Sequence, residues 1–90
     1  MNIGLIGYGK MGRDIFALLF DKLPDADIIV LEIYGAEENT AAVIKTLDKG
    51  LRRKKLTQEQ YDRKLGAFRF TDKAEDLKDC DLVIEAISRI

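Results

Sequence analysis

The chain has 90 residues, of which 47% are hydrophobic and 34% are charged, and its net charge at pH 7 is −1. This length allows one small domain, which would bury about 60 to 65% of its unfolded surface, and the near-zero charge gives no argument for a nucleic-acid or membrane partner. No apolar run is long enough to span a bilayer. A single cysteine, Cys80, excludes an internal disulfide and favours the reducing cytoplasm as the location.

The first third of the chain predicts a strand, a helix and a second strand. Residues 2–6 (NIGLI) indicate a short buried strand, and residues 27–33 (DIIVLEI) form the nearly continuous apolar run of a strand in a parallel sheet. Between them lie apolar residues at helical spacing, and Pro24 with Asp25 ends that helix. The residues at this spacing are Met11, Ile15, Leu18, Leu19 and Leu23.

The middle of the chain predicts two helices in succession. A long helix from about Ala36 to Lys54 carries three apolar residues on one face, which are Val43, Leu47 and Leu51. Residues 57–60 (TQEQ) have the form of a capping box and predict the start of a second helix. Tyr61 and Leu65 share a face of that helix.

The last third predicts two further strands. Residues 67–71 (AFRFT) alternate as in a strand, residues 72–77 predict one helical turn, and residues 81–87 (DLVIEAI) predict a final apolar strand. The alternation of strands and helices predicts an α/β fold, with a parallel sheet covered by helices on both faces.

Three glycines within six positions follow the first predicted strand and open the first helix. Gly7, Gly9 and Gly12 form a G-x-G-x-x-G pattern, in which the glycines permit a tight turn, close approach of a pyrophosphate, and close packing of helix on strand. The helix N-terminus adds free N–H donors and positive potential. The alternative is a glycine-rich turn without a ligand. We predict that the loop binds a dinucleotide through Gly7, Tyr8, Gly9, Lys10, Met11 and Gly12.

Glu32 supports the dinucleotide interpretation. It lies 20 residues beyond Gly12, at the end of the second predicted strand, where an acid accepts hydrogen bonds from the adenosine ribose hydroxyls. A carboxylate there would repel a 2′-phosphate, so the prediction is NAD rather than NADP. The predicted sheet is of the Rossmann type with strand order 3-2-1-4, which brings the first and fourth strands together. We expect Ile33, Ala86 and Ile87 to complete the cofactor site.

Together these segments resemble the N-terminal NAD-binding domain of the 3-hydroxyacyl-CoA dehydrogenase family. The resemblance covers essentially the whole chain and is carried by residues 3–12 (IGLIGYGKMG), 47–61 (LDKGLRRKKLTQEQY) and 81–87 (DLVIEAI). It implies NAD as the cofactor and, in a longer enzyme, oxidation of the 3-hydroxyl of acyl-CoA thioesters. The opening segment alone is shared with hydroxyisobutyrate and pyrroline-carboxylate reductases.

Three positions depart from the family's pattern. Glu32 stands where aspartate is usual, Arg89 stands where the family has a glutamate near the nicotinamide, and Arg13 follows the third glycine where small residues are usual. These differences predict a diverged member, whose cofactor is better defined than its acyl-CoA substrate.

A basic cluster ends the long predicted helix and consists of Lys49, Arg52, Arg53, Lys54 and Lys55. One interpretation is a solvated helix end whose cations favour the negative end of the helix dipole. The other is a phosphate contact for coenzyme A. By the resemblance, the coenzyme contacts in this helix correspond to Thr46 and Arg53, which a spacing of seven keeps on one helical face.

The sequence contains no candidate catalytic residue. It has no histidine and no metal-ligand cluster, and Cys80 lies between Asp79 and Asp81, which oppose thiolate formation. The resemblance places the family's catalytic pair beyond residue 90, so we expect a cofactor-binding part of a larger enzyme, inactive by itself. Two alternatives stay open: a free-standing nucleotide-binding or regulatory module, and a hydroxyisobutyrate- or imine-reductase type of enzyme.

The last predicted strand also predicts self-association. Residues 81–87 carry an apolar row consisting of Leu82, Val83, Ile84, Ala86 and Ile87, with Glu85 as the interior charge. An unpaired strand of this composition invites pairing with a second chain. We therefore expect a two-fold homodimer that continues the sheet.

Overall fold

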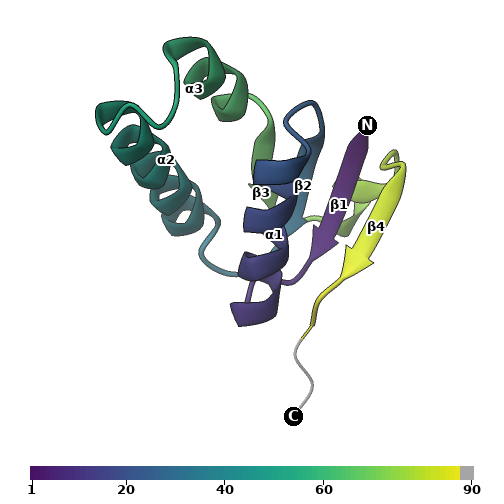
Figure 1. Ribbon diagram of the computed structural model, residues 1–90. Helices are drawn as coiled ribbons and strands as arrows, with labels where there is room; N and C mark the ends of the chain where they lie inside the picture. The colour runs from purple at the N-terminus through teal and green to yellow at the C-terminus, as the bar shows by residue number, and fades with distance from the viewer. Residues whose placement is uncertain (88–90) are drawn as a thin grey trace.

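The computed structural model describes residues 1–87, which form one parallel sheet with helices packed against it (Figure 1). Its four strands are β1 (Asn2–Ile6), β2 (Asp27–Leu31), β3 (Phe68–Thr71) and β4 (Leu82–Glu85). They lie in the order β3-β2-β1-β4, and every neighbouring pair is parallel. The predicted α/β fold and strand order are therefore confirmed.

The two central strands, β1 and β2, bury the side chains of one face of the sheet. Ile3 pairs with Ile28 and Leu5 pairs with Val30, and all four side chains are at most 1% exposed. Alternate residues of a strand point to the same face. The nearly continuous apolar sequence of these strands is thus divided between a deeply buried face and a less covered one.

The three α-helices of the described residues supply side chains to that buried face. They are α1 (Lys10–Lys22), α2 (Ala36–Arg52) and α3 (Gln58–Leu65). Phe16 of α1 and Val43 and Leu47 of α2 are buried in the core cluster, while Tyr61 and Leu65 of α3 pack at its edge. Figure 1 shows α1 in front of the sheet with α2 and α3 beside it.

The opposite face is covered by the short 3₁₀ helix η1 (Ala74–Leu77). Leu77 packs so closely beneath β1 that a Cβ added to Gly4 would lie 2.2 Å from its Cδ2 atom. Helices therefore lie on both faces, as predicted, but in the part of the chain that the structure describes the second face has only this one turn.

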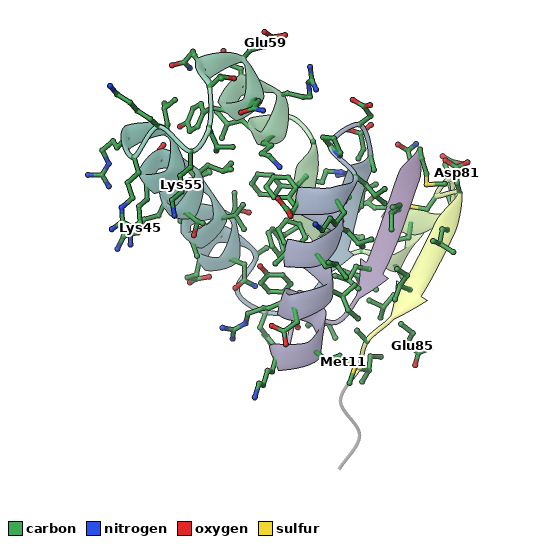
Figure 2. The ribbon with its side chains drawn as sticks, viewed as in Figure 1. Met11, Lys45, Lys55, Glu59, Asp81 and Glu85 are labelled. Carbon is green, nitrogen blue, oxygen red and sulfur yellow. The ribbon has the colours of Figure 1, made fainter. Side chains whose placement is uncertain are left out.

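The orientation of α1 differs from the sequence prediction. Gly12 and Phe16 are its buried residues, whereas Met11 is 60% and Leu18 is 58% exposed. Figure 2 shows Met11 at the surface on the first turn of α1. Apolar residues surround most of this helix, so their spacing alone could not select the buried side. Close contact of Gly12 with the preceding loop selects it instead.

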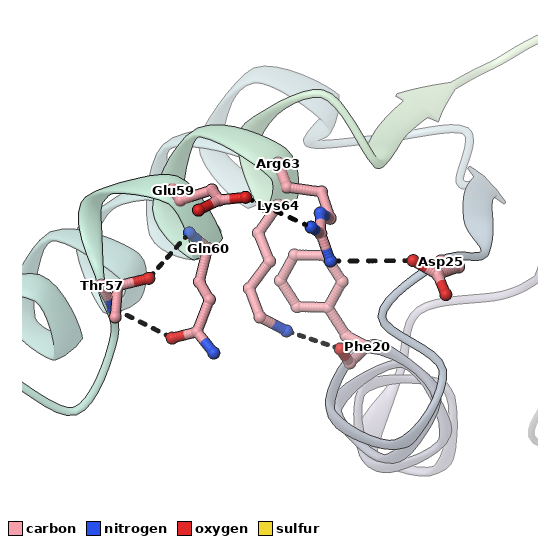
Figure 3. Close-up of polar contacts among 7 residues, drawn as sticks. All are labelled: Phe20, Asp25, Thr57, Glu59, Gln60, Arg63 and Lys64. Atoms are coloured by element: carbon pink, nitrogen blue, oxygen red, sulfur yellow. Dashed lines mark hydrogen bonds and ion pairs between the residues drawn. The ribbon is translucent and has the colours of Figure 1, made fainter.

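The other predicted boundaries that differ do so by one or two residues. β2 ends at Leu31, and α2 ends at Arg52 rather than near Lys54, whose φ of 59° is left-handed. The predicted capping box is confirmed: the Thr57 hydroxyl accepts from the Gln60 N–H at 3.1 Å, and the Gln60 side chain accepts from the Thr57 N–H at 2.9 Å (Figure 3).

Candidate dinucleotide-binding site

The loop between β1 and α1 begins with a glycine that the backbone requires. Gly7 has a φ of +96°, which side-chain-bearing residues rarely adopt. Its N–H donates to the Leu31 carbonyl at 2.9 Å, and an added Cβ would lie 3.0 Å from the Ala86 carbonyl oxygen. Gly7 thus turns the chain in the narrow space between the ends of β2 and β4.

Gly12 is required by the packing of α1 on this turn. A Cβ at position 12 would lie 2.2 Å from the Gly7 carbonyl oxygen, which is closer than any real contact of this kind. The third glycine therefore allows the helix to lie directly against the loop, as the sequence pattern predicts.

Gly9 has neither of these reasons to be a glycine. Its φ is −73°, an angle open to any residue, and an added Cβ would meet no atom within 4 Å. It is the N-cap of α1, where no side chain caps the helix and no acidic residue occupies the first turn. Since the first N–H groups of a helix have no intrahelical partner, the N-terminus of α1 keeps donors that its N-cap residue does not satisfy.

The Glu32 carboxylate lies beside the same loop. Its Oε2 atom accepts from the Tyr8 N–H at 2.9 Å, and the Glu32 N–H donates to the Thr71 carbonyl at 2.9 Å. The second bond extends the pairing of β2 with β3 and places residue 32 at the carboxyl edge of the sheet. Among residues 1–87, no partner is found for the other carboxylate oxygen, Oε1.

These groups border one hollow of about 390 Å³ at the carboxyl ends of β1, β2 and β4. Its lining comprises Ile6, Gly7, Tyr8, Gly9, Leu31, Glu32, Ile33, Ala86 and Ile87. Seven of the predicted cofactor-binding residues are among these, while Lys10, Met11 and Gly12 are not. Ile6 and Leu31 were missed, although as the last residues of β1 and β2 they mark the edge where ligands bind in such sheets.

The two predicted coenzyme A contacts lie in different hollows. Thr46 lines a cleft of about 360 Å³ between α1 and α2, whereas Arg53 lines a basic hollow of about 200 Å³ with Lys49 and Arg52. Arg53 follows the last residue of α2, where the chain leaves the helix. The structure therefore does not bring Thr46 and Arg53 into one cavity.

Two other residues singled out from the sequence lie away from the loop hollow. Arg13 lines the cleft between α1 and α2, with its guanidinium carbon 6.0 Å from the centre of the Tyr8 ring. Cys80 packs under β1, where burial, followed by the charges of Asp81 and Asp79, raises the pKa of its thiol. Arg89 lies outside the described residues.

Residues 1–87 contain neither a metal-binding cluster nor a membrane-spanning helix. No group of His, Cys, Asp and Glu side chains in that range is arranged to hold a metal ion. None of the helices in the same range has both the length and the apolar character needed to cross a bilayer.

Comparisons with known proteins agree with the geometry of the loop. The sequence profile described as "3-hydroxyacyl-CoA dehydrogenase, NAD binding domain" matches residues 2–89. A protein of Mycobacterium tuberculosis named 3-hydroxybutyryl-CoA dehydrogenase is 32% identical to this chain, over 96% of this chain and 30% of that protein. The chain thus spans about three tenths of the length of the curated relatives it matches.

Solved structures show the same similarity. The crystal structure of M. tuberculosis FadB2 has a TM-score of 0.77 and is 30% identical, over 96% of this chain and 30% of its own. The 3-hydroxybutyryl-CoA dehydrogenase of Escherichia coli has a TM-score of 0.82 and is 27% identical, over all of this chain and 19% of its own. The chain therefore belongs to the 3-hydroxyacyl-CoA dehydrogenase family and forms its NAD-binding domain.

Proposed function

We propose that the loop hollow holds the adenosine and pyrophosphate half of NAD, and that Gly9 is the observation that carries this assignment. As the N-cap of α1, Gly9 supplies no side-chain acceptor for the first helix N–H groups, which the usual N-cap residues Ser, Thr, Asp and Asn would supply. Neither the backbone angle nor any neighbouring atom requires a glycine here. An anion resting on the uncapped N-terminus of α1 would use the lack of a side chain, because it could approach the bare backbone and its N–H donors.

The other residues of the hollow fit the rest of this ligand. The Oε1 atom of Glu32 would accept a hydrogen bond from the adenosine ribose, while Oε2 keeps its hydrogen bond from the Tyr8 N–H. Ile33 is 69% exposed and would contact the adenine, and Ala86 and Ile87 would border the pyrophosphate from the end of β4. Lys10, Met11 and Gly12 would contribute main-chain N–H groups rather than side chains.

We further propose that this domain works within a longer cytoplasmic enzyme that oxidises the 3-hydroxyl of an acyl-CoA thioester. NAD, when bound, supplies a hydride acceptor, and the part of this chain is to bind and orient it. The chain has no histidine, so it offers no imidazole base. The names of the relatives support the substrate class. Coenzyme A contacts at Thr46 and Arg53 remain part of the proposal, as two separate contacts.

We also propose a homodimer through β4, an edge strand of the sheet. Within residues 1–87, β4 pairs only with β1, and Leu82, Val83 and Ile87 are 48%, 46% and 53% exposed. The predicted apolar row exposes fewer residues than expected from the sequence, because Ala86 is buried and Ile84 packs against the core. An edge strand with these exposed residues favours pairing with a second copy.

Titration of the chain with NADH, NADPH and ADP-ribose tests the cofactor assignment. We expect NADH to bind at least about tenfold more tightly than NADPH, a difference of about 1.4 kcal/mol, because the Glu32 carboxylate repels a 2′-phosphate. ADP-ribose should bind almost as tightly as NADH, since the hollow described here fits the adenosine half.

The Glu32→Ala variant provides the control. It should weaken NADH binding and narrow the preference over NADPH, with the fold retained in its circular dichroism spectrum. Equal affinity of the unaltered chain for both cofactors, or a preference for NADPH, would contradict the assignment.

A further inference from the structure

Tyr8 lies between the loop hollow and the cleft that separates α1 from α2. It borders the loop hollow, and it also lines the cleft together with Arg13, Phe16 and Thr46. It stands between Gly7 and Gly9, two residues that lose much conformational freedom on ordering. Whatever holds residue 8 therefore helps to fix the loop, together with the hydrogen bond from the Gly7 N–H to the Leu31 carbonyl.

The ring of Tyr8 is held by two other aromatic rings. Its centroid lies 4.8 Å from that of Phe70 on β3 and 5.7 Å from that of Phe16 on α1, with interplanar angles of 83° and 81°. Edge-to-face pairs of this kind are favourable beyond the area they bury. Burial also raises the pKa of the hydroxyl, while Arg13 partly offsets that rise. The side chain is thus anchored from the sheet and from the helix.

The main chain of Tyr8 in turn holds Glu32. The Tyr8 N–H donates to the Oε2 atom of the carboxylate at 2.9 Å, a hydrogen bond to a charged group and hence one of the stronger kinds. If the ring fixes the peptide, the peptide fixes the Glu32 carboxylate at the wall of the hollow. The aromatic anchor and the carboxylate are then parts of one arrangement.

We propose that Tyr8 is a positioning residue for cofactor selection: its ring, anchored on Phe16 and Phe70, orients through the Tyr8 N–H the carboxylate that distinguishes NAD from NADP. This inference rests on the proposed NAD site and adds how that site is held in shape. A rigid carboxylate loses less entropy when it binds the ribose, and it cannot turn aside to accommodate a 2′-phosphate. Both effects depend on the ring.

The test measures the ratio of NADPH to NADH dissociation constants in variants of the chain. Tyr8→Ala should lower this ratio about fivefold or more, and Tyr8→Phe, which keeps the ring, should restore it. If Tyr8 only stabilises the fold, both affinities will fall together and the ratio will not change. Tyr8→Leu serves as a second variant if Tyr8→Ala does not fold.

Phe20→Ala is the matched control, because Phe20 stacks on Phe16 and lines the same cleft but has no contact with the loop hollow. It should lower stability and leave the ratio unchanged. In the Glu32→Ala background, Tyr8→Ala should have no further effect on the ratio, because Tyr8 influences the ratio only through the Glu32 carboxylate.

These outcomes separate the two proposals. An unaltered chain that does not prefer NADH overturns the proposed function, and the role of Tyr8 with it. An unaltered chain that prefers NADH, together with Tyr8 variants that keep the ratio, overturns only the positioning role.

Discussion

At the residue scale, the three glycines of the loop have three different reasons to be glycine. Gly7 satisfies a left-handed backbone angle, and Gly12 leaves room for the Gly7 carbonyl. Gly9 has neither of these reasons; it is the N-cap of α1, a position where glycine is well tolerated. The same residue type in one short motif thus serves the turn at Gly7 and the helix packing at Gly12, and Gly9 would serve the approach of a ligand in the proposed NAD site.

Gly9→Ala should separate stability from binding. Because the Gly9 φ is ordinary and its Cβ direction is open, alanine should cost only what a poorer N-cap residue costs, about 1 kcal/mol, which lowers the thermal midpoint by about 4–8 °C. NADH affinity should nevertheless fall about tenfold or more, because the methyl group occupies the approach to the helix N-terminus. Thermal denaturation and NADH titration on the same preparation measure both effects.

Gly12→Ala is the comparison for this prediction. Its Cβ has no space beside the Gly7 carbonyl, so this variant should lose stability first and binding as a consequence. NADH binding by Gly9→Ala at the affinity of the unaltered chain would remove the main support for the cofactor site.

At the element scale, α3 depends on its contacts because a helix of eight residues is too short to be stable by itself. Its Tyr61 hydroxyl donates to Asp48 of α2, and the Lys64 ammonium group donates to the Phe20 carbonyl at 2.7 Å and lies 4.4 Å from the Phe20 ring centroid. Figure 3 shows Lys64 reaching the last turns of α1, where a cation also favours the helix dipole. The three helices are thereby joined into one layer.

Loss of the capping box should weaken α3. Thr57→Ala removes the acceptor for the Gln60 N–H and should lower the free energy of unfolding by about 1 kcal/mol. In a domain of this size that corresponds to a fall of about 4–8 °C in the thermal midpoint.

Thr57→Ser keeps the hydroxyl and should keep most of the stability. The NADH affinity of both variants should match that of the unaltered chain below the melting transition, because α3 does not border the loop hollow. A thermal midpoint of Thr57→Ala equal to that of Thr57→Ser would show that the box contributes nothing measurable.

At the scale of the whole molecule, the helices cover one face of the sheet, whereas within residues 1–87 the edge at β4 and part of the second face are exposed. Leu82 and Val83 are nearly half exposed, and η1 covers only part of the second face. This asymmetry makes β4 the natural place for a second copy to pair.

Light scattering after size-exclusion chromatography tests this arrangement. We expect a dimer in the unaltered chain and a shift toward monomer in Val83→Lys, since lysine on an edge strand discourages pairing. Val83 is the suitable position because it is 46% exposed, whereas Ile84 belongs to the core and its substitution would disturb the fold. A monomer at high concentration, with no effect of Val83→Lys, would rule the dimer out.

Local sequence determined the features that depend on neighbouring residues. The G-x-G-x-x-G pattern, the capping box at Thr57, and the apolar strands around Leu5 and Val30 led to the correct fold class and strand order. Each involves residues a few positions apart, so backbone conformation and periodicity were enough to predict them. The position of Glu32 was predictable for the same reason, because a strand of known length leads to it.

Tertiary structure decided what depends on residues far apart in the chain. The buried side of α1 follows from the contact of Gly12 with the Gly7 carbonyl, and the separation of Thr46 from Arg53 follows from where α1 and α2 leave space between them. The sequence did not predict that the Tyr8 ring packs against Phe70, nor that the Tyr8 N–H donates to Glu32, which lies 24 residues away. Such contacts arise only when the sheet aligns the ends of its strands, because that alignment, and not sequence spacing, sets the distance between the groups.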